Sequence, residues 1–240
     1  MTTRQPDLRA SIVPLDVPSL SMVSGPIPVP AIARGRTAFV IVDMQLYAAS
    51  RDHGLGAVIR EKGMAEAFDY YYTQIEAMTP RIAALLAASR KAGLEVIHVV
   101  TEGRTADGRD LGRESRKRKV DTPKNAPTSA ILPPLQAVGD EIVVAKTVSG
   151  GFAGTGLDLT LRSLGIETLI VTGVSTNQCV ENTVRAASNL GYDVILIEDG
   201  CATYNPEWQR YSLESMADQF ASVCRAADVL AAIDRLGGPA

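Results

Sequence analysis

The pattern of apolar and polar positions changes character near residue 37. Residues 1–35 carry six prolines, and their apolar residues follow neither a helical nor a strand period. From residue 37 onward, continuous apolar runs alternate with amphipathic stretches. The run over residues 37–42 ends at Asp43 and is typical of a strand buried on both faces of a parallel sheet. We therefore divide the chain into an irregular arm, residues 1–35, and one domain, residues 36–240.

Strands and helices are expected to alternate through this domain. Thr79 as N-cap, Pro80 in the first turn and Gly93 as the stop predict a helix over residues 79–92. The polar, turn-rich stretch 102–135 predicts a long loop with short helices. The alternation predicts an α/β fold, Rossmann-like, with three α/β/α layers and a central, mostly parallel sheet. Further strands are expected over 95–100, 141–145, 168–172, 193–197 and 220–224, and further helices over 156–164, 179–190, 207–217 and 226–236.

The proline-rich arm contains enough apolar side chains to favour burial over free disorder. We expect it to lie on the surface of the domain or on a neighbouring subunit. The apolar residues in question are Ile12, Val13, Leu15, Leu20 and Met22.

Charge and composition exclude several classes of protein. The net charge is −3, and no basic stripe suited to nucleic acid is present. No apolar stretch is long enough to span a membrane, and the N-terminus lacks the pattern of a signal peptide. Three cysteines without a CxxC pair favour a reduced, cytoplasmic setting. One dense basic run, residues 113–119, is read as a solvated surface, with a subunit contact or substrate steering as alternatives.

Three polar features follow apolar strands and are therefore expected at one edge of the sheet. They are Asp43, Lys146 and the turn 173–179 that ends at Cys179. In parallel sheets ligands bind beyond the carboxyl ends of the strands, near the point where strand order reverses. An acid, a base and a thiol converging there predict an active site.

Cys179 is the candidate nucleophile because it opens a helix directly after a strand and a tight turn. The free amides and the dipole at a helix start favour a thiolate, and we expect Lys146 to lower the thiol pKa further. The same amides can hold an oxyanion. Asp43 would carry the proton to the leaving amine. Cys201 and Cys224 are expected to be inert buried residues.

The sequence gives little support for a histidine-dependent hydrolase, a metal site or a phosphate-binding loop. The two histidines are His53 and His98, and His98 lies inside an apolar strand, where a satisfied core histidine is expected. Without paired His or Cys ligands, no metal is predicted. The glycines at 150–156 lack the GK[ST] of a phosphate loop and are expected to form a compact turn. The tyrosines at 70–72 are expected to pack in the core, with lining of the pocket or of a subunit interface as the alternative.

Taken together, these motifs resemble the isochorismatase-like cysteine hydrolases over residues 37–230. The resemblance implies a catalytic trio of Asp43, Lys146 and Cys179. It also implies a non-proline cis peptide at Val174–Ser175, with the amides of Ser175 and Cys179 as oxyanion donors. It rests on the segments VIVDMQ (40–45), Lys146, SGGF (149–152), TGL (155–157), TGVSTNQCV (172–180), GY (191–192) and ED (198–199).

Within that family, the resemblance is to the enzymes that cut ureido and carbamoyl amides. The presence of Cys179 and the absence of a histidine metal set argue against isochorismatase itself and against nicotinamidase. The expected activity is cleavage of a linear C–N amide bond in a biuret, triuret or N-carbamoyl type of compound. A simple carboxamide as substrate, or an inactive oligomeric family member, remain the alternatives.

The expected partners are a small-molecule substrate and further copies of the chain, in a homo-oligomer, with a tetramer as the expectation. No cofactor, nucleic acid or membrane is expected. Beyond the trio, the residues expected to contact the substrate are Gln45, Glu102, Phe152, Asn177 and Tyr204.

Overall fold

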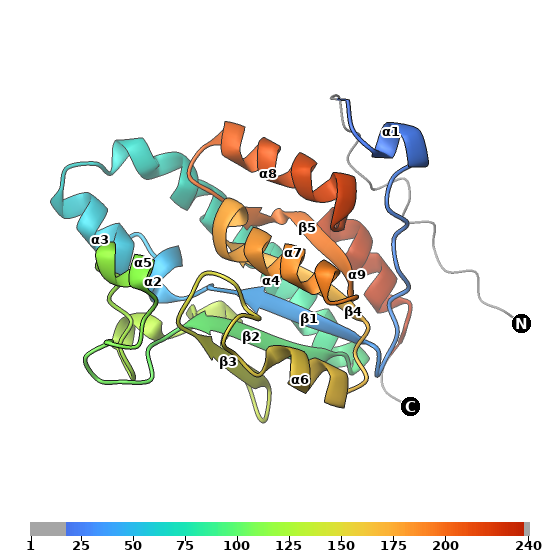
Figure 1. Cartoon of the computed structure of the whole chain (residues 1–240), viewed down its shortest axis with the longest axis horizontal. Coiled ribbons are helices and arrows are strands. Elements are labelled where there is room, and N and C mark those ends of the chain that lie inside the picture. The colour runs from blue at the N-terminus through green and yellow to red at the C-terminus, as the bar shows by residue number, and fades with distance from the viewer. Residues whose placement is uncertain (1–17, 238–240) are drawn as a thin grey trace, which may run out of the picture.

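The computed structural model describes residues 18–237 (Figure 1). Its strands are β1 (Thr37–Val42), β2 (Glu95–Thr101), β3 (Ile142–Lys146), β4 (Thr168–Val174), β5 (Asp193–Ala202) and β6 (Ser222–Cys224). Its α-helices are α1 (Ser21–Ser24), α2 (Leu46–Ala49), α3 (Gly54–Glu61), α4 (Asp69–Ala92), α5 (Arg113–Lys117), α6 (Leu157–Ser163), α7 (Glu181–Asn189), α8 (Pro206–Gln219) and α9 (Ala226–Asp234). The short 3-10 helices are η2 (Glu66–Phe68), η3 (Pro127–Ser129) and η4 (Pro133–Leu135), and a π-helical turn, η5 (Thr176–Val180), precedes α7.

The six strands form one sheet in the order β3-β2-β1-β4-β5-β6, and every neighbouring pair is parallel. The chain builds outward from β1 in one direction and then from β4 in the other. The strand order therefore reverses between β1 and β4, which is where a doubly wound sheet binds its ligand. The predicted α/β/α class and the parallel sheet are confirmed.

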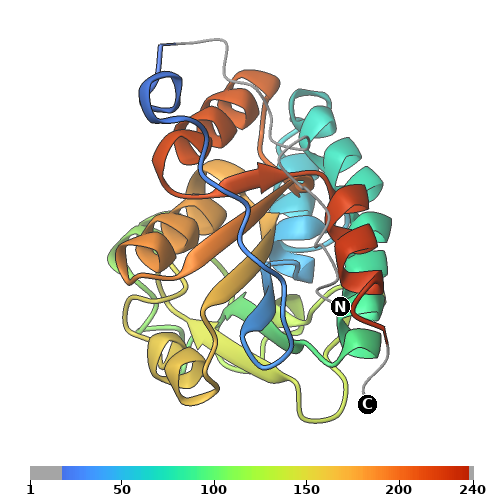
Figure 2. The ribbon, with the colours of Figure 1, turned by 90° about the vertical axis from the view of Figure 1, so that its right-hand side faces the viewer.

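Helices cover both faces of the sheet, and each face has its own apolar core (Figure 2). Phe39 and Ile41 of β1 face the core under α4 and α9, whereas Val40 and Val42 face the core under α6, α7 and α8. Successive strand residues point to opposite faces. A strand covered on both sides is consequently apolar throughout, and all six residues of β1 are buried.

Helix α4 begins ten residues before the predicted start, so the assignment of Thr79 and Pro80 to a helix start is wrong. Pro80 lies inside the helix, and the hydroxyl of Thr79 donates to the carbonyl of Ile75. Because a proline removes only one amide donor, a helix with a strongly buried face can tolerate it. Tyr71, Tyr72, Ile75 and Met78 continue the apolar face of α4 upstream of Pro80 and are all at most 3% exposed.

Residues 18–35 cross the outside of the domain beside β6 and α8 (Figure 2). The hydroxyl of Ser222 donates to the carbonyls of Ile27 and Pro28. Leu20 and Met22 are 59% and 63% exposed on the short helix α1 of this single chain, so their burial on a neighbouring subunit stays a prediction. The other apolar arm residues, Ile12, Val13 and Leu15, lie outside the described residues. Between residues 18 and 237, no helix is long and apolar enough to cross a membrane.

Gly173 allows β4 to approach β1 at the edge of the sheet. Its φ is 126°, and an added Cβ would lie 2.0 Å from the carbonyl oxygen of Val42. We expect Gly173→Ala to lower the free energy of unfolding by roughly 3 kcal/mol or more, since backbone must move. The matched control is Gly156→Ala, where an added Cβ meets nothing within 4 Å. Chemical denaturation of both variants measures the difference, and equal stabilities would contradict this role.

Candidate active site

The three predicted catalytic side chains meet at the carboxyl edge of the sheet. Asp43 follows β1, Lys146 ends β3, and Cys179 lies in the turn η5 after β4. Asp43 adopts a left-handed backbone conformation, with φ of 51°, which an aspartate tolerates better than most residues. Its amide donates to the carbonyl of Val99 at 2.8 Å. Asp43 and Lys146 are buried, and Cys179 is partly exposed.

A closed hydrogen-bond network joins Asp43, Lys146 and Thr101. The Lys146 Nζ lies 2.8 Å from Asp43 Oδ2 and donates to Thr101 Oγ1 at 2.6 Å. The hydroxyl of Thr101 in turn donates to Asp43 Oδ1 at 3.0 Å. Thr101 ends β2 and pairs in register with Lys146. Buried charges need this kind of pairing, because leaving either one alone costs several kcal/mol.

The Cys179 thiol completes the site. Lys146 Nζ donates to its Sγ at 3.5 Å, and Ser149 Oγ donates from the other side at 3.7 Å. Ser149 is itself held by Asn182 of α7, whose Nδ2 donates to Ser149 Oγ at 2.9 Å. The sulfur is therefore oriented by a cation from β3 and by a hydroxyl from the following loop.

The expected low pKa of Cys179 is wrong, because the pKa of this thiol is raised. Burial and, after it, the carboxylate of Asp43 raise the pKa of the thiol to about 12, because the nearby ammonium of Lys146 offsets them only in part. Cys179 also lies inside the π-helical turn η5, two residues before α7 begins, and not at the first turn of that helix. Burial acts in the opposite sense on Lys146, but the charges of Asp43 and of an ionised Cys179 together raise the Lys146 pKa.

The turn that carries Cys179 is anchored from three directions. The Val174–Ser175 peptide is cis, and the hydroxyl of Ser175 is 3.2 Å from that of Tyr71 in α4. Thr176 Oγ1 donates to Gln209 of α8 at 2.7 Å. Thr203, just beyond β5, donates to Asn177 Oδ1 at 2.6 Å. Helices on both faces of the sheet consequently position the amides of this turn.

Two of the residues expected to contact the substrate, Gln45 and Phe152, are buried side chains with structural contacts, and their contact with a substrate stays a prediction. Gln45 is fully buried, and its amide nitrogen donates to the carbonyls of Thr101 and Ser129 while its oxygen accepts from the Thr101 amide. No donor hydrogen of that amide group is left for a substrate, so Gln45 joins β2 to the 102–135 loop instead. Phe152 packs in the core under α7, 5.9 Å from the ring of Tyr192.

The remaining three expected contacts stay predictions. Glu102 is half-buried and accepts from the amide of Asn125. Asn177 is half-buried beside Cys179 in the turn η5, and Tyr204 is half-buried next to Tyr71, with ring centroids 4.8 Å apart. All three lie on segments that follow the carboxyl ends of strands.

Thr101 and Tyr47 were not predicted as site residues, and Tyr71 was expected only to pack, with lining of the pocket or of a subunit interface as the alternative. Thr101 is a polar residue at the end of an apolar strand, the same pattern that identified the trio. Because threonine is common in strands, the pattern did not single it out. Tyr47 follows Asp43 by four residues, and the charges of both Asp43 and Cys179 act on its hydroxyl. Tyr71 belongs to the tyrosine cluster that was expected to pack, and it is fully buried while touching Ser175.

The histidines lie apart from the hydrogen bonds that join the trio. His98 is buried, 3.4 Å from Glu141, and burial lowers its pKa. Its Nδ1 has no partner within the part of the chain that is described, so only one ring nitrogen is satisfied. His53 precedes α3 near the surface and contacts Ser50. Over residues 18–237, no group of three or more His, Cys, Asp or Glu side chains is placed to hold a metal ion.

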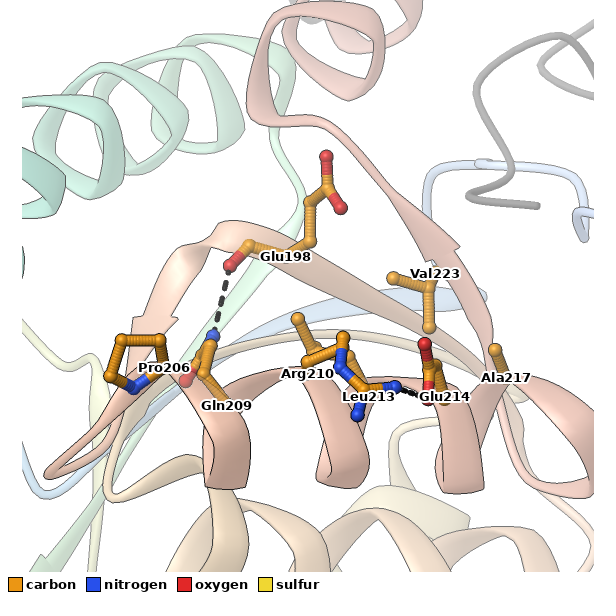
Figure 3. A pocket seen from close by; sticks show the side chains of 8 residues that line it. All are labelled: Glu198, Pro206, Gln209, Arg210, Leu213, Glu214, Ala217 and Val223. Carbon is orange, nitrogen blue, oxygen red and sulfur yellow. Dashed lines mark hydrogen bonds and ion pairs between the residues drawn. The ribbon is translucent and has the colours of Figure 1, made fainter. Parts of the chain in front are cut away.

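A separate hollow of about 270 Å³ lies between α8 and the strands β5 and β6 (Figure 3). Gln209 reaches across it toward the carbonyl of Glu198. None of the three candidate catalytic residues lines this hollow. Gln209 lines this hollow and also accepts a hydrogen bond from Thr176 of the turn η5, so it links the hollow to the candidate active site.

The doubly wound sheet with this polar cluster at its carboxyl edge defines a three-layer α/β hydrolase. Over residues 37–228 the sequence matches the isochorismatase domain, and the chain belongs to the isochorismatase family of hydrolases. The fold agrees with that of a cysteine hydrolase from Pseudomonas syringae pv. phaseolicola 1448A. That structure has a TM-score of 0.72 and 28% sequence identity, covering 86% of this chain and 96% of that one.

Two curated relatives extend this similarity. The chain is 33% identical over 159 residues to the uncharacterized isochorismatase family protein YecD of Escherichia coli O157:H7, which covers 63% of this chain and 81% of that protein. It is 30% identical over 220 residues to the ureidoacrylate amidohydrolase RutB of Pantoea ananatis (strain LMG 20103), with 81% of this chain and 82% of that protein covered.

The two charged neighbours of Cys179 should move its reactivity in opposite directions. Asp43→Asn removes a negative charge, which should lower the thiol pKa and shift alkylation by iodoacetamide to lower pH by at least about one unit. Lys146→Ala removes the positive charge and should shift alkylation to higher pH. Mass spectrometry of the Cys179 peptide across pH measures both shifts, with the exposed Lys62→Ala as control. A profile unchanged by Lys146→Ala would remove the lysine from control of the thiol.

Thr101 should act as a positioning residue. Thr101→Val removes the hydroxyl that bridges Asp43 and Lys146, so kcat/KM should fall about tenfold and its pH profile should shift. Thr101→Ser restores the hydroxyl and should recover most of the activity. The matched control is Thr172→Val in β4, because the buried hydroxyl of Thr172 has no partner in the described structure. Equal losses in Thr101→Val and Thr101→Ser would show that only packing matters.

Proposed function

We propose that this chain is an amidohydrolase that cleaves a linear C–N amide bond of a small ureido or carbamoyl compound, with Cys179 as nucleophile. The observation that carries the proposal is the contact of Lys146 Nζ with both the Asp43 carboxylate and the Cys179 sulfur. One group thus connects a proton carrier with a thiol, which is the arrangement required for covalent catalysis. The similarity to a ureidoacrylate amidohydrolase over most of the chain supports an amide as substrate.

In the first half of the proposed reaction, Asp43 takes the thiol proton and Cys179 Sγ attacks the carbonyl carbon. The raised pKa of Cys179 keeps the resting thiol protonated, so proton transfer accompanies attack. The amides of Ser175 and Cys179 would stabilise the oxyanion. Asp43 then returns the proton to the leaving nitrogen, the C–N bond breaks, and an amine or ammonia departs from a thioester-type intermediate.

In the second half, water replaces the amine. Asp43 takes a proton from the water, whose oxygen bonds to the carbonyl carbon. The C–S bond then breaks, and Asp43 returns the proton to the Cys179 sulfur. The products are the amine and an acid, which is a carbamate when the substrate is a ureide. Lys146 supplies a fixed positive charge beside both the sulfur and the carboxylate throughout.

This scheme requires no cofactor or metal, and both expectations stay predictions, as does the homotetramer. A simple carboxamide is the competing substrate class, since the same thiol chemistry would cleave it. Release of ammonia from biuret, triuret, N-carbamoylsarcosine and simple carboxamides separates the two classes. Activity on carboxamides alone would contradict the ureide assignment, and activity on none of these compounds would contradict the proposed function.

Cys179→Ala and Cys179→Ser should each lower kcat at least about 10³-fold while the protein stays folded. The thiol is a far better nucleophile at neutral pH than a serine hydroxyl in the same place. Circular dichroism and the melting temperature check the fold. The control is Cys201→Ala, since Cys201 is buried in the core under α7 and has no role in the scheme. Substantial turnover by either Cys179 variant would disprove the nucleophile assignment.

A further inference from the structure

The loop that follows β3 brings a serine hydroxyl to the candidate nucleophile. Ser149 Oγ donates to Cys179 Sγ at 3.7 Å, and Asn182 Nδ2 of α7 donates to Ser149 Oγ at 2.9 Å. A serine hydroxyl has one hydrogen to donate, and its oxygen has two acceptor sites. Because the oxygen of Ser149 accepts from Asn182, its hydrogen points away from that amide and toward the sulfur. The reaction proposed above uses neither side chain.

A glycine allows this loop to lie against the start of α7. An added Cβ at Gly151 would lie 3.2 Å from Thr183 Oγ1, closer than ordinary van der Waals contact. The Gly151 amide donates to Thr183 Oγ1 at 3.0 Å, and that hydroxyl donates to the Cys179 carbonyl at 2.6 Å. The loop is therefore joined to the backbone of Cys179 without the side chain of Ser149, whose hydroxyl is left to contact the sulfur.

The sulfur receives only part of the charge of Lys146. This residue divides its three ammonium hydrogens between the sulfur at 3.5 Å, the carboxylate of Asp43 at 2.8 Å and the hydroxyl of Thr101 at 2.6 Å. Burial and the charge of Asp43 raise the pKa of Cys179 to about 12. The charge of Lys146 and, after it, the hydrogen bond from Ser149 oppose this rise in pKa. Ser149 is exposed, whereas Asp43 and Lys146 are buried, so its hydroxyl approaches the sulfur from the exposed side of the site.

We propose that Ser149 is a further catalytic residue, whose hydroxyl stabilises negative charge on the Cys179 sulfur, and that Asn182 is the positioning residue that aims this hydroxyl. This inference rests on the proposed amidohydrolase function. When Asp43 takes the thiol proton, charge builds on the sulfur until the C–S bond forms, and a hydrogen bond to an ionised group is the stronger kind. The contact acts again when the C–S bond breaks, before Asp43 returns the proton. Ser149 keeps its own proton throughout, so the proton balance of the reaction is unchanged.

Ser149→Ala should slow the alkylation of Cys179 by iodoacetamide about tenfold at a fixed pH below the thiol pKa, because only the thiolate reacts. With a ureide substrate, kcat should fall by about the same factor and its pH profile should move to higher pH. Ser149→Thr keeps a hydroxyl and should recover most of both rates. The control is Ser163→Ala on α6, an exposed serine whose hydroxyl donates to the carbonyl of Leu159. The melting temperatures of these variants should match that of the wild type.

Asn182→Asp tests the aim of the hydroxyl. A carboxylate accepts where the amide donates, so it would draw the hydrogen of Ser149 away from the sulfur, and alkylation should slow more than in Asn182→Ala. The added negative charge alone would also raise the thiol pKa, so both changes are repeated together with Ser149→Ala. The extra loss in Asn182→Asp should shrink there, because no hydroxyl remains to be turned. Asn189→Ala, at the other end of α7, is the control.

Alkylation reports on the sulfur without a substrate, which separates this inference from the proposed function. Alkylation of Ser149→Ala at the wild-type rate or faster would overturn the inference, even in a protein that hydrolyses ureides. An extra loss in Asn182→Asp that is the same with and without the Ser149 hydroxyl would overturn the role of Asn182. Slower alkylation of Ser149→Ala, in a protein that hydrolyses no ureide or amide, would support the contact of Ser149 with the sulfur and contradict the proposed function.

Discussion

The buried contact between the Lys146 ammonium and the Asp43 carboxylate constrains everything else at the carboxyl edge of the sheet. Lys146 ends β3 and Asp43 follows β1, and these strands are not neighbours, because β2 lies between them. Thr101 of β2 bridges them with its hydroxyl. The pair can only form if three strands stay in register, and the loss of one partner would leave an unpaired charge in an apolar setting. The geometry of the site therefore depends on the register of these three strands.

The same pair determines the state of the thiol. Lys146 is close enough to stabilise a thiolate, but its charge is largely matched by Asp43, and burial favours the neutral sulfur. Under the proposed function, Cys179 would be a protonated nucleophile beside Asp43 as the acceptor for its proton. This differs from a preformed thiolate at a helix start, since in the proposed reaction the proton would move when the sulfur attacks the substrate carbonyl.

Both helical layers contribute to the site although the trio comes from strand ends. Tyr71 of α4 contacts the turn from one face of the sheet, and Gln209 of α8 holds it from the other. Both residues belong to helices whose main energetic role is to bury the sheet. Core packing and the geometry of the candidate site are consequently coupled, and a cavity made under α4 would displace the turn η5 as well as destabilise the domain.

The order of strands and helices, the parallel sheet and the convergence of Asp43, Lys146 and Cys179 followed from the sequence, because these depend on local apolar periodicity and on where each strand ends. The boundaries of α4 did not, since burial of Tyr71, Tyr72 and Ile75 outweighs the local preference of Pro80 for a helix start. The structural contacts of Gln45 and Phe152 did not follow from the sequence either, because adjacency to a candidate catalytic residue does not decide which way a side chain faces. The thiol pKa, the bridging by Thr101 and the contact of Tyr71 with Ser175 were decided by tertiary structure alone, since desolvation and contacts between distant segments exist only in the folded chain.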